Sequence, residues 1–496
     1  MLRISGTRKT LCDGLTRRDF LHVGGIGALG LSLADVASLQ AFTSPGTGFG
    51  KAKSCILLFP YGSPSSHETF DPKPEMPDVQ GEMKSIATSV PGLHICDRLP
   101  KLAKVMDKIT VVRSMTHPYP VHGLAYAVTG IPTYTPELEA RARDNRHWPF
   151  IGSVVDYLER KRSNPASEIP RNIGLPWLVS SKSDDPSINA GPFAAFLGDE
   201  YDPLWTDFDG AGLHIAPKNT VDQKKRYRNP FGGTTPDDRF HMSSASKAPT
   251  DVSIERLRMR SLLAQFDRDR RWLDRSPQVR AWDSQQQLAM SLLTSNKMRD
   301  ALDIGLEPRA SRERYGMNLF GQGCLAARRL IEAGGKFVTV FWDCFGHFAN
   351  GAWDTLQYHY PRMKELLLPG FDLAYPALLS DLDERGLLDE TLVIWMSEHG
   401  RTPKINSKPG AGREHWSRAY SVALAGGGTA RGKIVGQTTR DGGEVLDNRF
   451  HQKTSRQRHT IHWELTRIRQ CRIGSVNRIP LRAAVSCAPS YSVSRC

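Results

Sequence analysis

The sequence predicts an α/β protein with a central, mostly parallel sheet between helices and a helical and irregular insertion. Three runs of apolar and β-branched residues have the length and composition of strands buried on both faces, at 54–59, 336–342 and 391–396. A helical stretch at 363–385 joins the last two runs, and this strand, helix, strand order predicts a parallel βαβ unit. The length of 496 residues suits one large domain with insertions, or two domains.

Residues 1–41 have the pattern of a twin-arginine signal peptide. Arg17 and Arg18 precede an apolar run rich in Gly and Ala over 23–39. The alternative is a chance arginine pair before a buried helix. We expect export through the twin-arginine pathway to the periplasm or beyond, with no membrane span left once the signal is removed. Residues 42–53 form a linker rich in Gly, Ser, Thr and Pro.

The predicted α/β domain runs from 54 to 445 and contains the insertion at about 149–333. The first part of the insertion is rich in Pro, Gly and Asp turns, and the second part has charged helices with apolar residues three and four positions apart. The helical stretch before the last strand is expected to break at Pro369-Gly370 and to end at Gly386. The other elements expected near the start of the domain are a helix at 99–107, a strand at 109–113 and a helix at 122–129.

The net charge of +14 is concentrated in the last residues of the chain. Residues 448–496 hold ten Lys and Arg against one acid, so the rest of the chain has a surplus of only five positive charges. This distribution argues against nucleic acid as a partner of the domain. The eight cysteines are widely spaced and form no CxxC pair, which argues against a disulfide framework.

Two of the apolar runs end in an acid and a histidine, and a third histidine follows on a loop. The residues concerned are Asp343 and His347 after one run, Glu398 and His399 after the other, and His415 in the sequence GREHW. Open α/β sheets bind ligands outside the carboxyl ends of their strands, and imidazole nitrogen and carboxylate oxygen bind divalent ions. Each fragment alone has a structural interpretation, but together they predict a site for Zn, Mn or Ca. Adjacent residues such as Glu398 and His399 often divide between the ion and its outer shell.

Several segments of the chain resemble one exported family. They are SPSSHETFDPKP, DALDIGLEPRASRERYGMNLFGQGCLAARRLIEAGGKFV, DLDERGLLDETLV, SEHGRTP and GREHW. The resemblance is to the sulfatase-like family called domain of unknown function 1501, in the alkaline phosphatase and sulfatase superfamily, and it covers about 54–445. It implies an alkaline phosphatase-like fold with a site for one or two metal ions at the strand ends. By this resemblance Asp343, His347 and His415 would hold one ion, and Glu398 and His399 would serve a second.

The chain departs from the superfamily pattern at two places. Active members carry an acid directly after the first strand, where this chain has Phe59-Pro60-Tyr61. They also place a Ser, Thr or Cys nucleophile at a helix start, where His122 is the nearest candidate here. We therefore expect His122 to act in catalysis, with Arg401 or Arg413 as a clamp for an anionic ester.

Two functions remain open from the sequence. The first is an exported metal-dependent hydrolase of sulfate or phosphate esters, acting on small-molecule or polysaccharide-derived substrates. The second is a non-catalytic metal-binding or scaffold protein of a cell-surface complex that handles glycans. The resemblance also implies an exported cytochrome-like partner for such a complex.

The composition changes at residue 446, where the resemblance stops. One interpretation is a basic tail that is disordered or binds nucleic acid. The other is a frameshift: read in the neighbouring frame, the codons of residues 452–466 permit K-D-x8-L-G-I-D, which is similar to the usual end of this family. We interpret 446–496 as an aberrant basic tail produced by a frameshift and expect no function in it.

Overall fold

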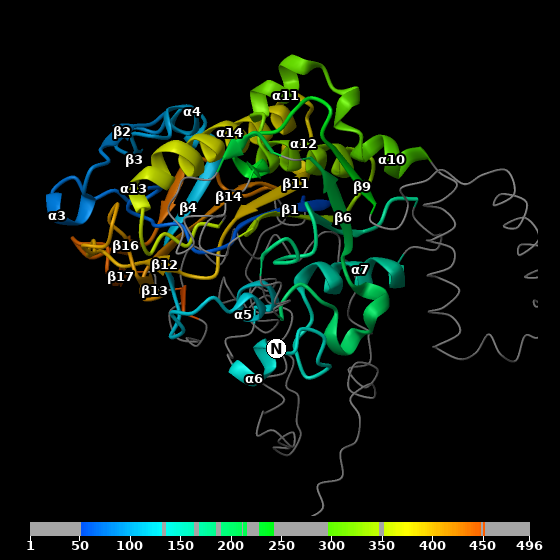
Figure 1. Cartoon of the computed structure of the whole chain (residues 1–496), viewed down its shortest axis with the longest axis horizontal. Helices are drawn as coiled ribbons and strands as arrows, with labels where there is room; N and C mark the ends of the chain where they lie inside the picture. Colours follow the sequence, from blue (N-terminus) through cyan, green and yellow to red (C-terminus); the bar gives the residue numbers. More distant parts are fainter. Residues whose placement is uncertain are drawn as a thin grey trace, which may run out of the picture.

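The computed structural model describes residues 51–130, 135–162, 168–184, 190–210, 212–215, 228–242, 296–346, 352–447 and 450–451. Its main feature is a 10-stranded sheet (Figure 1). The strands lie in the order β15 (Lys433–Val435), β4 (Ile109–Thr116), β14 (Tyr420–Gly426), β11 (Thr391–Trp395), β1 (Ser54–Pro60), β10 (Phe337–Trp342), β5 (Asn172–Leu175), β6 (Leu204–Asp209) and β9 (Arg239–Met242), with β18 (Phe450–His451) also beside β4.

The middle of the sheet is parallel. β1 pairs in parallel with β10 on one side and with β11 on the other, and β5 and β6 continue the parallel order beyond β10. Among the described strands of this sheet, only β14 and β9 run against the others. The predicted α/β class with a mostly parallel sheet is therefore confirmed. The βαβ unit between β10 and β11 passes over β1, which lies between them.

Alternate residues of the central strands face two different cores. Ile56 and Leu58 of β1 belong to one apolar cluster, and Leu57 and Phe59 belong to a second cluster on the other face. Every residue of β1 is buried, as expected for a strand with both faces covered. Burial of each large apolar side chain contributes roughly 1.5–3 kcal/mol, so these alternating residues hold the helices against the sheet.

Helices cover both faces of the sheet (Figure 1). The first face is covered by α4 (Pro100–Ala103), α10 (Asn296–Leu302), α11 (Arg309–Tyr315), α12 (Leu319–Glu332) and α14 (Leu368–Glu384). The second face carries α5 (Leu124–Thr129) and α7 (Ile151–Arg162), with α6 (Pro136–Glu139) on the same side. Smaller elements are α3 (Pro77–Gln80) and the two-stranded pairs β2 (Ser85–Ala87) with β3 (His94–Cys96), β7 (His214–Ile215) with β8 (Arg228–Asn229), β12 (Gly400–Arg401) with β13 (His415–Trp416), and β16 (Gln437–Thr438) with β17 (Val445–Asp447).

The expected break at Pro369-Gly370 is wrong, because helical structure continues through it. The short helix α13 (His359–Arg362) and the π-helical turn η9 (Met363–Leu367) lead directly into α14. Pro369 occupies the first turn of α14, where its missing N–H costs little. A Cβ on Gly370 would lie 2.6 Å from the Trp342 ring, so glycine allows the helix to pack closely on β10. Gly386 follows α14 with a positive φ, as the sequence predicted.

Other expectations are met in part. The helix expected at 99–107 is divided into α4 and the 3-10 turn η2 (Met106–Lys108), whereas the strand at 109–113 is longer and ends at Thr116. The predicted signal peptide and most of the linker, the helical segment at 251–295 and the tail from 452 lie outside the described residues. Within the described residues no helix is both long and apolar enough to cross a membrane.

Candidate metal centre

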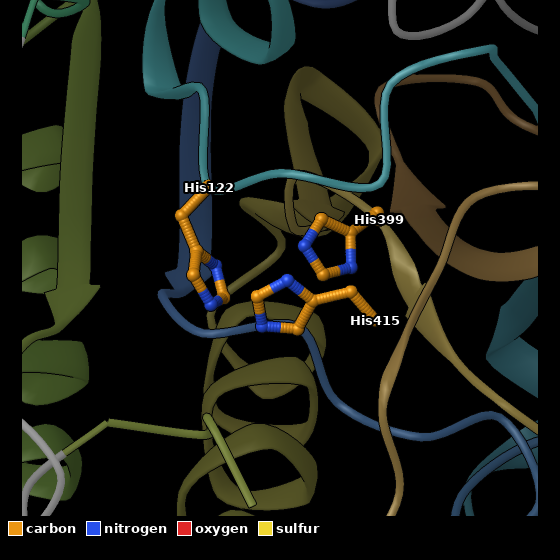
Figure 2. Close-up of side chains that lie close together, drawn as sticks. All are labelled: His122, His399 and His415. Carbon is orange, nitrogen blue, oxygen red and sulfur yellow. The ribbon is translucent and has the colours of Figure 1, made fainter. Parts of the chain in front are cut away.

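Three histidines meet at the carboxyl ends of the parallel strands (Figure 2). His122 precedes α5, His399 follows β11, and His415 lies in β13. The pairing of β12 with β13 sets His415 opposite Arg401 and so returns the chain to the end of β11. One nitrogen of each histidine lies within 4.8 Å of the others, and no second cluster of this kind occurs in the part of the chain that the structure describes.

Two of these imidazoles are oriented by a hydrogen bond at Nδ1. His122 Nδ1 lies 2.6 Å from Glu398 Oε1, and His399 Nδ1 lies 2.8 Å from the carbonyl oxygen of Gly400. An imidazole that donates from Nδ1 carries its lone pair on Nε2, which is the arrangement found in histidines that bind metal ions.

The Nε2 atoms of His122, His399 and His415 are all buried and have no hydrogen-bond partner. Buried polar atoms in folded proteins nearly always have one. Three buried imidazole nitrogens without a hydrogen bond in one place therefore fit a divalent ion, which imidazole nitrogen binds well. Solvent reaches the group from the side of His415, whose side chain is 27% exposed, whereas His399 is 1% exposed.

Both carboxylate oxygens of Glu398 accept hydrogen bonds from protein groups. Its Oε1 accepts hydrogen bonds from His122 Nδ1 and from the Gly62 amide, and its Oε2 accepts one from Ser397 Oγ at 2.5 Å. The side chain is fully buried. The resemblance assigned Glu398 to a second ion; in the structure its contacts orient the ring of His122, as the outer-shell partner of a metal-binding histidine would.

Asp354 faces two of these histidines, His122 and His415, and was not found from the sequence. Its Oδ2 lies 3.3 Å from His122 Nε2, and its Oδ1 lies 3.5 Å from His415 Nε2. Arg401 Nη2 lies 2.6 Å from the same Oδ1. The one signal in the sequence was an acid in the loop between β10 and the next helix, and no spacing pattern connected that acid with GREHW.

The pKa values of the three-histidine group and of Asp354 are shifted by burial and by neighbouring charges. Burial disfavours the imidazolium of His122, but the carboxylates of Asp354 and Glu398 outweigh this and raise its pKa to about 9. Burial, followed by the positive charges of His122 and Arg401, holds the pKa of His399 well below its ordinary value. Burial opposes ionisation of Asp354, but Arg401 and the histidines keep its pKa well below the usual range. His399 is therefore neutral, and an ion would displace a proton from His122.

Asp343 is not part of the three-histidine group. Its Oδ2 accepts hydrogen bonds from Trp177 Nε1 at 3.0 Å and from the Ser180 amide at 2.7 Å. Burial raises the pKa of this carboxyl group to about 6. His347, its predicted partner, lies outside the described residues. The structure thus unites His399 and His415, which the resemblance had assigned to different ions, and adds His122 to them.

The two arginines predicted as an anion clamp are buried and use their donors within the protein. Arg413 donates to Glu68 and to the carbonyl oxygens of Thr402, Pro403 and Val79. Arg401 donates to the carbonyl oxygens of Ser63, Gly62 and Arg413 and also contacts Asp354. These contacts of the two buried guanidinium groups fit a positioning role, and the anion clamp stays a prediction.

The turn after β1 has no acidic side chain at its start, and it contacts the site through the backbone amide of Gly62. Gly62, with φ of 99°, donates its amide to Glu398 Oε1 at 2.9 Å. A Cβ at this position would lie 2.4 Å from the Asp354 amide nitrogen, so glycine lets the end of β1 approach the loop that carries Asp354. The end of the first strand therefore supports the site through a hydrogen bond and close packing.

The family of the chain follows from comparison with family models. The model described as "Protein of unknown function (DUF1501)" matches residues 52–457. The chain belongs to this family. The resemblance noted in the sequence is therefore confirmed, and the matched range extends past residue 445. No curated protein matches the chain.

Two solved structures are similar to this chain at low sequence identity. The crystal structure of PsFucS1 sulfatase from Pseudoalteromonas sp. has a TM-score of 0.35 and 10% identity, over 90% of this chain and 72% of that chain. The crystal structure of Ps i-CgsB in complex with k-i-k-neocarrahexaose has a TM-score of 0.26 and 11% identity, over 80% of this chain and 73% of that chain.

Proposed function

We propose that this protein is an exported, metal-dependent hydrolase of sulfate or phosphate esters, acting on polysaccharide-derived or small-molecule substrates. One observation carries the proposal. The Nε2 atoms of His122, His399 and His415 are buried without a hydrogen bond, two of them facing Asp354, and they lie together at the strand ends where α/β sheets bind ligands. A divalent ion held there would act as a Lewis acid and neutralise the non-bridging oxygens of the ester.

The chain's own residues would hold and orient the reacting groups. Glu398 fixes the ring of His122, and the Gly400 carbonyl fixes the ring of His399. Arg401 neutralises one oxygen of Asp354 and holds the turn after β1 through the carbonyl oxygens of Gly62 and Ser63. Because the side chains of His122 and His415 are part-exposed, an ester group approaching from solvent would reach the histidine group on their side.

The test is turnover by the purified mature protein. Aryl sulfate and aryl phosphate esters and a sulfated oligosaccharide are supplied before and after treatment with a chelator, for the native protein and for His399→Ala. We expect activity that chelation removes, that Zn²⁺ restores and that His399→Ala lacks. His94→Ala is the matched control, because His94 is an exposed residue of β3, and it should retain the native rate.

Failure of the native, metal-loaded protein to hydrolyse any of these esters would reject the enzyme and favour the scaffold alternative. That alternative retains a metal centre without turnover, together with the exported cytochrome-like partner. A pull-down of exported haem proteins with the full-length chain would then test the partner directly.

A further inference from the structure

We propose that Glu68 is a positioning residue of the three-histidine group, and that its buried carboxylate fixes the two segments of chain that carry His415 and Asp354. Glu68 stands in SPSSHETFDPKP, a segment that the proposed hydrolase leaves without a role. The inference rests on the proposed function in that it concerns the same group. It goes beyond that function because Glu68 acts through Arg413 and His359, and not on an ion or a substrate.

The carboxylate of Glu68 is fully buried and contacts two side chains that are remote from it in sequence. Its Oε1 accepts hydrogen bonds from Arg413 Nε at 3.0 Å and from Arg413 Nη2 at 2.6 Å, and its Oε2 lies 3.2 Å from His359 Nε2. All three side chains are 0% exposed. Burial opposes ionisation of Glu68, but Arg413 and His359 outweigh it and hold the pKa of Glu68 below its ordinary range. Glu68 is therefore a buried anion held between Arg413 and His359.

The partners of Glu68 belong to two segments that pair with each other. The first segment, 354–360, begins at Asp354, and the second, 406–415, ends at His415. Backbone hydrogen bonds join them, from the amides of Arg413, Tyr358, His359 and Tyr360 to the carbonyl oxygens of Thr355, Pro409, Ala411 and Gly410, respectively. Each segment therefore has one end beside the histidine group and one side chain in contact with Glu68.

The stretch 402–416, which carries His415, has one buried side chain, that of Arg413. The other buried residue of this stretch is Gly412, which has no side chain to pack. The guanidinium of Arg413 forms an ion pair with Glu68 at 2.6 Å, and its other donors go to backbone carbonyl oxygens. His415 follows two positions later in the chain. The charge of Glu68 therefore anchors the stretch from which His415 reaches the other histidines.

His359 connects Glu68 with the residue next to Asp354. His359 Nδ1 lies 2.8 Å from Thr355 Oγ1, and Thr355 directly follows Asp354 in the chain. Asp354 Oδ1 in turn lies 3.5 Å from His415 Nε2. The contacts of Glu68 therefore lead, on both sides, to the pair formed by Asp354 and His415. Groups locked in this way by packing and by hydrogen bonds behind the site keep it within the narrow tolerance that binding requires.

The experiment removes the charge of Glu68 and keeps its shape. Glu68→Gln is compared with Asp381→Asn in the metal-free full chain, and hydrogen exchange of the backbone amides is measured. Asp381→Asn is the matched control, because Asp381 of α14 pairs at 2.9 Å with Arg328, which is also buried. We expect the amides of 411–416 to exchange about tenfold faster in Glu68→Gln and at the native rate in Asp381→Asn.

A second measurement follows the geometry of the histidine group. Co²⁺ binds the same kinds of ligand as Zn²⁺, and its visible absorption depends on how those ligands are arranged. Titration with Co²⁺ should show binding weakened by roughly 10- to 100-fold and an altered spectrum in Glu68→Gln. Asp381→Asn should keep the native affinity and spectrum, because a loss of stability alone does not rearrange the histidines of a folded chain.

Glu68→Asp is the second variant, for use if Glu68→Gln does not fold. It keeps the charge that Arg413 needs but moves it by one methylene group, so it should raise the exchange of 411–416 by a smaller factor. Native exchange and a native Co²⁺ spectrum in a folded Glu68 variant would overturn the proposal, and so would equal changes in Asp381→Asn. If the native protein binds no Co²⁺, the proposed function fails, and exchange in the metal-free protein still decides the role of Glu68.

Discussion

Replacing Glu398 with Gln should weaken zinc binding by about tenfold without unfolding the protein. The carboxylate receives the Nδ1–H of His122 at 2.6 Å, the Gly62 amide at 2.9 Å and the hydroxyl of Ser397. The amide oxygen of Gln can still accept the bonds from His122 and Gly62, and its NH₂ group would face Ser397 Oγ in place of Oε2. What the variant loses is the negative charge behind the imidazole.

The magnitude follows from that loss of charge. A hydrogen bond to a charged group contributes roughly 1.5–3 kcal/mol and a neutral one roughly 0.5–1.5 kcal/mol. The difference of about 1–2 kcal/mol corresponds to a factor of roughly 5–30 in the dissociation constant. This agrees with the cost usually seen when the outer-shell partner of a metal-binding histidine is removed.

The assay is chelator competition for Zn²⁺ at fixed pH, with unfolding in urea followed in parallel. Asp372→Asn is a matched control, because Asp372 is a buried carboxylate that accepts hydrogen bonds from the Lys101 and Leu102 amides at the start of α4. Its zinc affinity should be native. Unchanged affinity in folded Glu398→Gln would refute the outer-shell role, and a loss of several thousandfold would show that Glu398 binds the ion directly.

Three further predictions concern stability and the tail. Burial raises the pKa of Glu139 from 4.5 to about 7. The protonated carboxyl group therefore stabilises the fold fully below pH 4.5, and this stabilisation is lost as the pH rises through 7. Glu139→Gln should remove up to about 3 kcal/mol of the pH dependence of the unfolding free energy, measured in urea between pH 4.5 and 8. Arg413→Met should cost roughly 3–5 kcal/mol in urea unfolding, because it leaves Glu68 buried without its cation, and a loss below about 1 kcal/mol would contradict this. Deletion of 452–496 should leave the zinc affinity and the melting temperature unchanged. A decrease in either quantity would support the basic-tail interpretation, and so would resequencing of the locus that confirms this reading frame.

The sheet was predictable because its central strands are buried on both faces. Uninterrupted apolar runs such as those of β1, β10 and β11 leave few alternatives once a helix connects two of them. The sequence did not show that β1 lies between β10 and β11, because strand order depends on long-range packing. β14 also escaped prediction, although it is fully buried, since no pattern separated YSVALAG from the surrounding loops.

The site was predictable where its residues follow an apolar run or stand in a motif of the family, and not where they come from a loop without such a motif. His399 and His415 were expected as ligands because each stands beside an apolar run or in a family motif, and His122 was expected to be catalytic as the candidate nearest to the expected nucleophile position. Asp354 lies in the loop beyond β10, and tertiary contacts, including Arg401 and the close approach of Gly62, hold it beside His122 and His415. The sequence marks Arg401 and Arg413 near the site, but it does not show that backbone carbonyl oxygens surround both guanidinium groups.

The histidine group draws on parts of the chain that are remote in sequence. His122 and Glu398, which must be in contact for the site to exist, are 276 positions apart. An ion with this ligand set has no comparable partner in an unfolded or half-folded chain, so it binds only after β1, β11 and α5 have assembled. Bound metal would therefore act as a reporter of completed folding. If the chain is exported in a folded state, as its sequence predicts, the ion would have to be loaded before export.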